Sequence, residues 1–255
     1  MKKILLLMLF PAALYAQLIP QKYLTIGAGF SETLYDSKDL DRFEAEYNAL
    51  FNDRLAKPFD GFGAAEGIRV EIGYRKVARW GHGVLAGAHF HTSRDGADFF
   101  NGDSRALELK LNELFVEYQI GRTWNNVFVN AVCVFSFNRS FSLKSDYTAV
   151  ADTVVTDRTL TGTYKAGKSF STDLGIAFGV LKEPMLLTAK ISYPIYSGGK
   201  KKVFEDNDPN KIASGFEKFP AEYNNFLFGD DYKGIASDIE GLKILVTASI
   251  VIRLR

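Results

Sequence analysis

Eight stretches of this chain alternate apolar and polar residues, and the gaps between them are long and short in turn. Strict alternation is typical of a half-buried β-strand, because successive side chains point to opposite faces. Long gaps of about 10 to 40 residues alternate with turns of about 3 to 7 residues. This rhythm predicts an all-β, up-and-down antiparallel barrel of eight strands with all long loops at one end. The predicted long loops are about 32–63, 95–104, 139–167 and 198–239.

The two faces of the predicted strands differ in composition, and the difference predicts a membrane barrel. Ile68, Val70 and Ile72 alternate with Arg69 and Glu71, and the other strands repeat this contrast. A charge on a lipid-facing position costs about 2–4 kcal/mol at mid-bilayer, so the charged face must line the interior. The predicted lumen charges are Arg69, Glu71, Arg75, Glu113, Glu117, Asp173, Lys190, Lys243 and Arg253. An eight-stranded interior is narrow enough for these side chains to fill with ion pairs, and a narrow ion path is the alternative.

The N-terminus predicts export. Lys2 and Lys3 precede the apolar run 4–10, and Ala16 is a small residue before Gln17. This pattern predicts a secretory signal at 1–16 that is cleaved, which leaves 17–255 as a single domain. The chain has 31 basic and 30 acidic residues, a balance that gives no indication of nucleic-acid binding.

The signal and the eight alternating segments together resemble the small eight-stranded outer-membrane barrels of diderm bacteria, the group of the OmpA transmembrane domain, OmpX and OmpW. The resemblance covers almost all of residues 17–255 and rests on pattern rather than on a motif. It implies the outer membrane of a Gram-negative bacterium, with short turns in the periplasm and long loops outside. The sequence departs from the group at Arg253-Leu254-Arg255, where such barrels commonly end in an aromatic residue.

A helix is predicted in the first external loop. Ser37 is the expected N-cap, followed by Asp39 and Asp41 in the first turn, where acidic residues favour the helix dipole. The apolar residues that recur at helical spacing are Leu40, Phe43, Tyr47, Leu50 and Phe51. This face is expected to pack at the barrel mouth, and the alternative is a partner-binding surface or a lid.

Leu107, Leu109 and Leu111 lie in the opposite apolar register from the strand segment that follows them. Either a bulge near Asn112 flips the face, or this half rises above the membrane with its leucines turned inward. We favour the second interpretation, which also gives the predicted helix an apolar surface to pack on.

The fourth external loop is rich in aromatic residues, which disordered loops usually lack. Its rings are expected either to pack over the mouth or to bind an external ligand. A lysine run at its start is either a solvated charge run or a contact for lipopolysaccharide phosphates. The binding candidates are Phe216, Phe219, Tyr223, Phe226, Phe228, Tyr232, Lys200, Lys201 and Lys202.

Asp206, Asp208, Asn210 and Glu217 have the spacing of positions 1, 3, 5 and 12 of a calcium loop. Position 6, which requires a sharp turn and usually glycine, is Lys211. A polar turn is therefore the favoured interpretation, with calcium as the alternative and no other cofactor expected.

The enzyme alternative consists of His89, His91 and Ser93, with Glu108 or Glu113 to orient the histidine. This set resembles the outer-membrane lipid A deacylases, in which histidine activates serine for ester attack. That family carries a longer His-x-Ser-Asn run, whereas Arg94 follows Ser93 here. The favoured hypothesis is a non-enzymatic barrel whose folded external loops bind a partner, lipid or small ligand, or brace the envelope. The alternatives are a lipid-modifying hydrolase and a narrow small-solute channel.

Overall fold

The computed structural model of the chain describes residues 20–150, 160–198, 203–214, 218–220 and 240–255. The predicted signal at 1–16 lies outside the described residues and stays a prediction. The same holds for Lys200–Lys202, Phe216, Glu217 and the aromatic residues from Tyr223 to Tyr232.

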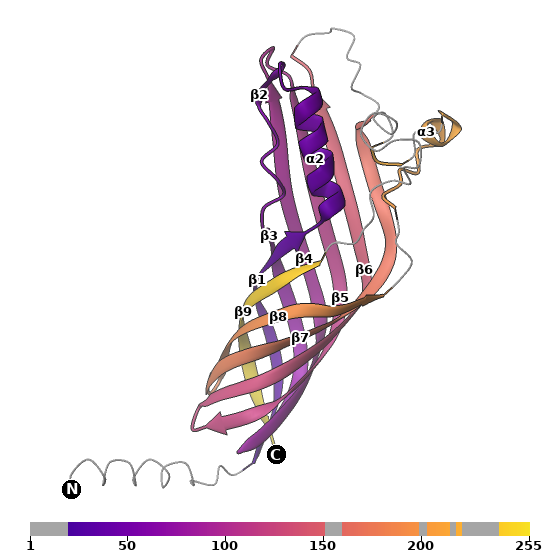
Figure 1. The fold of residues 1–255 in the computed structure, drawn as a ribbon. Helices are drawn as coiled ribbons and strands as arrows, with labels where there is room; N and C mark the ends of the chain where they lie inside the picture. Colours follow the sequence, from indigo (N-terminus) through magenta and orange to yellow (C-terminus); the bar gives the residue numbers. More distant parts are fainter. Residues whose placement is uncertain (1–19, 151–159, 199–202, 215–217, 221–239) are drawn as a thin grey trace, which may run out of the picture.

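Eight antiparallel strands form a closed ring, so the predicted fold is confirmed (Figure 1). Around the ring the order is β1, β3, β4, β5, β6, β7, β8 and β9, and β9 pairs again with β1. The short β2 (Leu55–Lys57) pairs with the outer end of β4. The ring strands are β1 (Gln21–Asp36), β3 (Ala65–Val77), β4 (Trp80–Phe99), β5 (Ser104–Trp124), β6 (Val127–Thr148), β7 (Gly162–Lys182), β8 (Met185–Gly198) and β9 (Glu240–Leu254).

The outer face of the ring is a belt of exposed apolar side chains. Ile68 is 58% exposed and Ile26 is 51% exposed, and exposed apolar residues recur at alternate positions along all eight strands. Such a surface is stable only against lipid, and closure of the ring pairs the backbone groups that lipid cannot satisfy. The protein is therefore a transmembrane barrel of the kind found in bacterial outer membranes.

Among the described residues, no helix is both long and apolar enough to cross a membrane.

The ring is much taller on one side than on the other (Figure 1). β4, β5, β6 and β7 continue as a sheet beyond the membrane, and extended strands therefore occupy much of the ranges predicted as loops. In the ranges 95–104 and 139–167, residues 95–99, 139–148 and 162–167 are strand. In 32–63, β1 continues to Asp36 and is followed by the helix α2 (Lys38–Leu50).

The leucines of β5 point inward without any flip of the strand face. Burial alternates without interruption from Leu107 through Leu111 to Glu117, so the second interpretation of this strand is correct. The apolar register changes because the surroundings change. Above the membrane the inner face meets α2, and within the membrane it meets the charged lumen. A bulge does occur nearby, but in β6, where Asn138 has φ 54° and adds one residue opposite β5.

Candidate functional site

Two buried glutamates organise the charges in the middle of the lumen. The Glu117 carboxylate accepts hydrogen bonds from Arg69 Nη2 at 2.7 Å and from Lys190 Nζ at 2.5 Å, and also from Gln119. Arg69 Nε in turn donates to Glu71 at 2.6 Å. All of these side chains are buried, so each charge is compensated by an opposite charge at contact distance.

The second glutamate, Glu113, lies closer to the external side. Its carboxylate is 2.8 Å from Lys243 Nζ, 2.8 Å from His89 Nδ1 and 3.1 Å from Arg139 Nε. Lys243 also lies 2.9 Å from Asp173. The two networks together cross the lumen from β3 and β4 to β8 and β9.

Of the nine lumen charges expected from the sequence, all but Arg253 are buried inside the barrel. The placement of Arg253 in this network is wrong. The strand face is right, but Arg253 lies one residue from the end of β9, where the interior opens and the side chain is exposed. Arg139 and His89, absent from the expected network, belong to it. Alternation along β6 places Arg139 outside, and the bulge at Asn138 turns it inward.

Apolar layers close the lumen on both sides of the charges. At the periplasmic end, a cluster of six buried side chains fills the interior: Tyr23, Val77, Phe128, Leu181, Leu186 and Val251. At the external end, a larger apolar cluster includes the leucines of β5 and the buried face of α2. The lumen is therefore filled along its length, with charges between two apolar layers.

The helix α2 packs on the inner face of the tall sheet, as the sequence predicts. Leu40, Phe43 and Tyr47 are buried against Leu107, Leu109 and Leu111. Ser37 occupies the N-cap position with extended backbone, but its side chain makes no capping hydrogen bond. Leu50, expected on the buried face, is 41% exposed because the helix ends there.

Phe219 is the one aromatic binding candidate of the fourth loop within the described residues, and it is buried under α2. Its ring centroid lies 4.9 Å from that of Phe43 and 4.9 Å from that of Tyr164. Phe204 is also buried in this cluster. These rings belong to the apolar layer at the mouth, so Phe219 is not available to an external ligand.

A pair of carboxyl groups joins α2 to β4. Asp95 Oδ2 accepts hydrogen bonds from the backbone N–H groups of Asp60 and Gly61 at 3.1 and 2.9 Å. Glu44 on α2 is buried beside Asp95. Burial raises the pKa of the Glu44 carboxyl to about 8, and the carboxylates of Asp95 and Asp41 act in the same direction. Glu44 is therefore largely protonated at neutral pH, and its carboxyl hydrogen-bonds to Asp95.

The turn with calcium-loop spacing holds a lysine ammonium group. Lys211 Nζ lies 2.8 Å from Asp206 Oδ2 and 3.0 Å from Tyr164 Oη. Asp208 Oδ1 accepts the backbone N–H of Asn210 at 2.9 Å, at the start of the short helix α3 (Pro209–Ser214). Among the described residues, no group of three or more histidine, cysteine or acidic side chains could hold a metal ion.

The structure brings together only part of the enzyme alternative: His89 Nδ1 lies 2.8 Å from Glu113, but Ser93 is bonded elsewhere. His91 Nε2 contacts Ser31 Oγ at 2.7 Å, and Ser93 Oγ donates to the Gly63 carbonyl at 3.2 Å. Glu108 lies on the opposite, outward face of the sheet, where its carboxylate pairs with Arg94 and Lys110, each at 2.6 Å. The second carboxylate considered, Glu113, is bound to His89 and two cations.

A basic face covers the outside of the tall sheet directly above the lipid belt. The registers place Lys110, Ser142 and Lys165 in one row across β5, β6 and β7. In the next row outward, Arg94, Glu108 and Lys144 lie side by side. We call this surface the external basic face, and its cations are Arg94, Lys110, Lys144, Lys165 and Lys168.

No protein-family model and no curated protein matches the sequence. Among solved structures, the chain is similar to Ail, the attachment invasion locus protein of Yersinia pestis, solved in complex with the heparin analogue sucrose octasulfate. The identity is 10%, the match covers 91% of this chain and 99% of Ail, and the TM-score is 0.43. The chain is also similar to the outer membrane protease OmpT from Escherichia coli, with 10% identity, 92% and 96% coverage and a TM-score of 0.39.

Proposed function

We propose that this protein is a non-enzymatic outer-membrane barrel whose external sheet binds anionic groups at the cell surface. The observation that carries the proposal is the external basic face. Five cations lie on adjacent strands there. Glu108 lies among them, paired with Arg94 and Lys110, and Glu205 lies opposite Lys165 at the end of the row. Lys144 is paired with Asp146 at 2.6 Å at the outer edge of the face.

The rigidity of the sheet favours this function. β4, β5, β6 and β7 are joined by continuous pairing above the membrane, and α2 packs behind them. A ligand therefore meets cations whose backbone is already ordered, and binding requires little further loss of conformational entropy. Phosphate, sulfate and carboxylate groups on saccharides are the ligands whose charge and spacing suit a flat array of lysines.

The filled lumen supports a surface function rather than transport. A solute would have to pass an apolar layer at each end and two ion-pair networks between them. The apolar layers are stabilised by burial and the ion-pair networks by charge pairing. The lumen therefore offers no continuous polar path through the described part of the barrel.

The test measures binding of the purified protein in nanodiscs to lipopolysaccharide and to heparin, a soluble sulfated polysaccharide. The variant with Lys110→Glu and Lys165→Glu is expected to bind at least one of these polyanions about tenfold more weakly than the unmodified protein, with steep salt dependence. The control is Lys182→Glu, a lysine-to-glutamate change at the periplasmic end. Equal binding by all three proteins, or no binding of either polyanion, would refute the proposal.

A further inference from the structure

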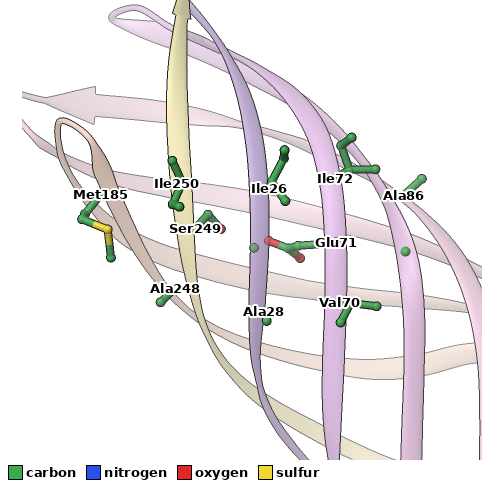
Figure 2. A pocket seen from close by; sticks show the side chains of 12 residues that line it. Ile26, Ala28, Val70, Glu71, Ile72, Ala86, Met185, Ala248, Ser249 and Ile250 are labelled. Carbon is green, nitrogen blue, oxygen red and sulfur yellow. The ribbon is translucent and has the colours of Figure 1, made fainter.

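An apolar groove crosses the outer surface of β9, β1, β3 and β4 within the lipid belt (Figure 2). Its volume is about 610 Å³. Ile250, Ile26 and Ile72 form one row of its wall, and the alanines Ala28 and Ala248 leave the neighbouring row low. The groove exists because Ala28 pairs with Ala248, whereas the next outward-facing pair is Ile26 and Ile250.

A basic cleft of about 590 Å³ lies at the periplasmic end of two of these strands, β1 and β9. Its charged lining residues are Lys22, Arg253 and Arg255, all exposed, and no acidic residue lines it. Arg253, excluded from the lumen by its position at the strand end, is thus part of a cationic surface at the membrane boundary.

The groove and the cleft are aligned along one strand pair. Lys22 pairs with Leu254, Ile26 with Ile250 and Ala28 with Ala248. From Lys22 to Ile26 the strand advances about 13 Å along its own axis, which is about 10 Å along the membrane normal at the usual strand tilt. The apolar band of such barrels is about 25 Å tall, so a groove near its middle places the cleft at the headgroup level.

The rest of the periplasmic rim is also basic. Lys76, Arg79, Arg122 and Lys182 flank the short turns, and Glu183 is the acidic residue of these turns. Glu183 accepts a hydrogen bond from Tyr23 Oη at 2.5 Å and so faces back toward the barrel. These rim cations lie outside the cleft, so they provide a matched comparison for its three cations.

We infer that this side of the barrel binds one anionic glycerophospholipid of the periplasmic leaflet, with its phosphate in the basic cleft and an acyl chain in the groove. A second copy of the chain is a poorer occupant. A symmetric dimer through β9 and β1 would bring two clefts lined by Lys22, Arg253 and Arg255 close to one another, and like charges there would repel. A zwitterionic phospholipid offers the same phosphate but brings an ammonium group toward three cations, and these like charges repel.

The first experiment uses native mass spectrometry of the full barrel released from nanodiscs that contain equal amounts of phosphatidylglycerol and phosphatidylcholine with matched chains. We expect retention of one phosphatidylglycerol molecule in preference to phosphatidylcholine. The variant with Lys22→Gln, Arg253→Gln and Arg255→Gln should lose this preference. The ratio of retained phosphatidylglycerol to phosphatidylcholine should fall about fivefold for each cation removed. The matched control with Arg79→Gln, Arg122→Gln and Lys182→Gln, which lie outside the cleft, should keep it.

The second experiment tests the acyl-chain seat without changing any charge. The variant with Ala28→Phe and Ala248→Phe fills the groove and should lower retention of phosphatidylglycerol. In the control variant with Ala131→Phe, the exposed lipid-facing alanine of β6 is replaced, and retention should not change. Circular dichroism checks that each variant is folded.

Four outcomes would overturn the inference. These are equal retention of the two lipids by the unmodified protein, undiminished retention after the groove is filled, a dimer mass in place of a lipid adduct, and displacement of the lipid by equimolar glycerol 3-phosphate. The last result would show that the site recognises the phosphate alone.

Discussion

Glu44 links the protonation of one buried carboxyl to the stability of the barrel mouth. Its folded-state pKa of about 8 lies above the ordinary value of 4.5, so the folded state binds a proton that the unfolded state releases. Stability therefore falls as the pH rises from 4.5 through 8. In Glu44→Gln the amide keeps a hydrogen-bond donor toward Asp95 and cannot ionise.

We expect the unfolding midpoint of the unmodified protein to fall between pH 5 and pH 9, whereas that of Glu44→Gln stays nearly level. The difference at pH 9 should be on the order of a few kcal/mol. Urea titrations in detergent across this range measure it. Glu46→Gln, on the exposed side of α2, is the control. Parallel pH profiles for the two variants would contradict the assignment.

Glu117 is the residue on which the inner charge network depends. Glu117→Gln leaves Arg69 and Lys190 buried with less opposite charge, and we expect a loss of about 3–5 kcal/mol in the free energy of unfolding. The double variant with Lys190→Met should recover part of this loss, because one uncompensated cation is removed. Equilibrium unfolding in lipid vesicles gives both values, and a loss below about 1 kcal/mol would show that water already solvates this site.

Alternation predicts that Arg69, Glu113 and Lys243 face the lumen, because side-chain direction along a strand depends only on sequence parity. It does not predict which charges meet, since partners come from strands whose stagger around the ring is set by the whole barrel. Glu113, for example, contacts residues from β4, β6 and β9. Arg139 escapes the parity rule because of one inserted residue. The asparagine at 138, a residue that tolerates positive φ, was a signal for that bulge.

The β6 bulge depends on the left-handed backbone at Asn138. Glycine adopts this conformation at little steric cost, whereas a β-branched residue adopts it with strain of about 1–2 kcal/mol. Asn138→Gly should therefore leave the unfolding free energy within about 0.5 kcal/mol of the original, and Asn138→Val should lower it by more than 1 kcal/mol. Equal stability of the two variants would show that the strand straightens and the bulge is not required.

The helix α2 is a separate layer whose loss should leave the transmembrane ring intact. Phe43 is fully buried between Tyr47, Phe59 and Phe219, so Phe43→Ala should destabilise this layer by about 3–5 kcal/mol. Hydrogen exchange of residues 38–50 should accelerate while the membrane strands stay protected. Arg42→Ala, an exposed position on the same helix, is the matched control. Faster exchange throughout β1 and β9 would instead show that helix and ring unfold together.

The presence of α2 follows from helical spacing of apolar residues, and its docking site follows from the reversed register of β5. Strand lengths were harder to predict. Lys144 alternates with Leu143 as a half-buried strand requires, but it lies above the membrane and was assigned to an external loop. A strand length chosen to match the membrane thickness omits the part of the sheet above the membrane, because that part is stabilised by its own apolar core.

The layered lumen predicts that the barrel does not conduct ions. Purified protein in planar bilayers should show no discrete openings at moderate voltage, because two apolar layers flank the ion pairs. Replacement of side chains in the periplasmic layer by alanine should not change this, since the charge networks remain. Reproducible single-channel steps from the unmodified protein would support the channel alternative and contradict the filled interior.

The closed ring itself is the feature most accessible from sequence, since alternation and gap lengths depend on local chain properties. The ion-pair partners and the clefts on the surface depend on several strands at once. Lys22 and Arg253 are distant in sequence, for instance, and meet only because the first and last strands pair.

The tall sheet gives the molecule a front and a back in the plane of the membrane. The external basic face lies on β4, β5, β6 and β7 above the bilayer, while the apolar groove lies on β9, β1, β3 and β4 within it, so the two surfaces share only β4. Rotation about the membrane normal therefore changes what a neighbouring molecule encounters. A partner approaching from one flank meets cations above the bilayer, and one approaching from the other flank meets hydrocarbon within it, so neighbours would be sorted by their direction of approach.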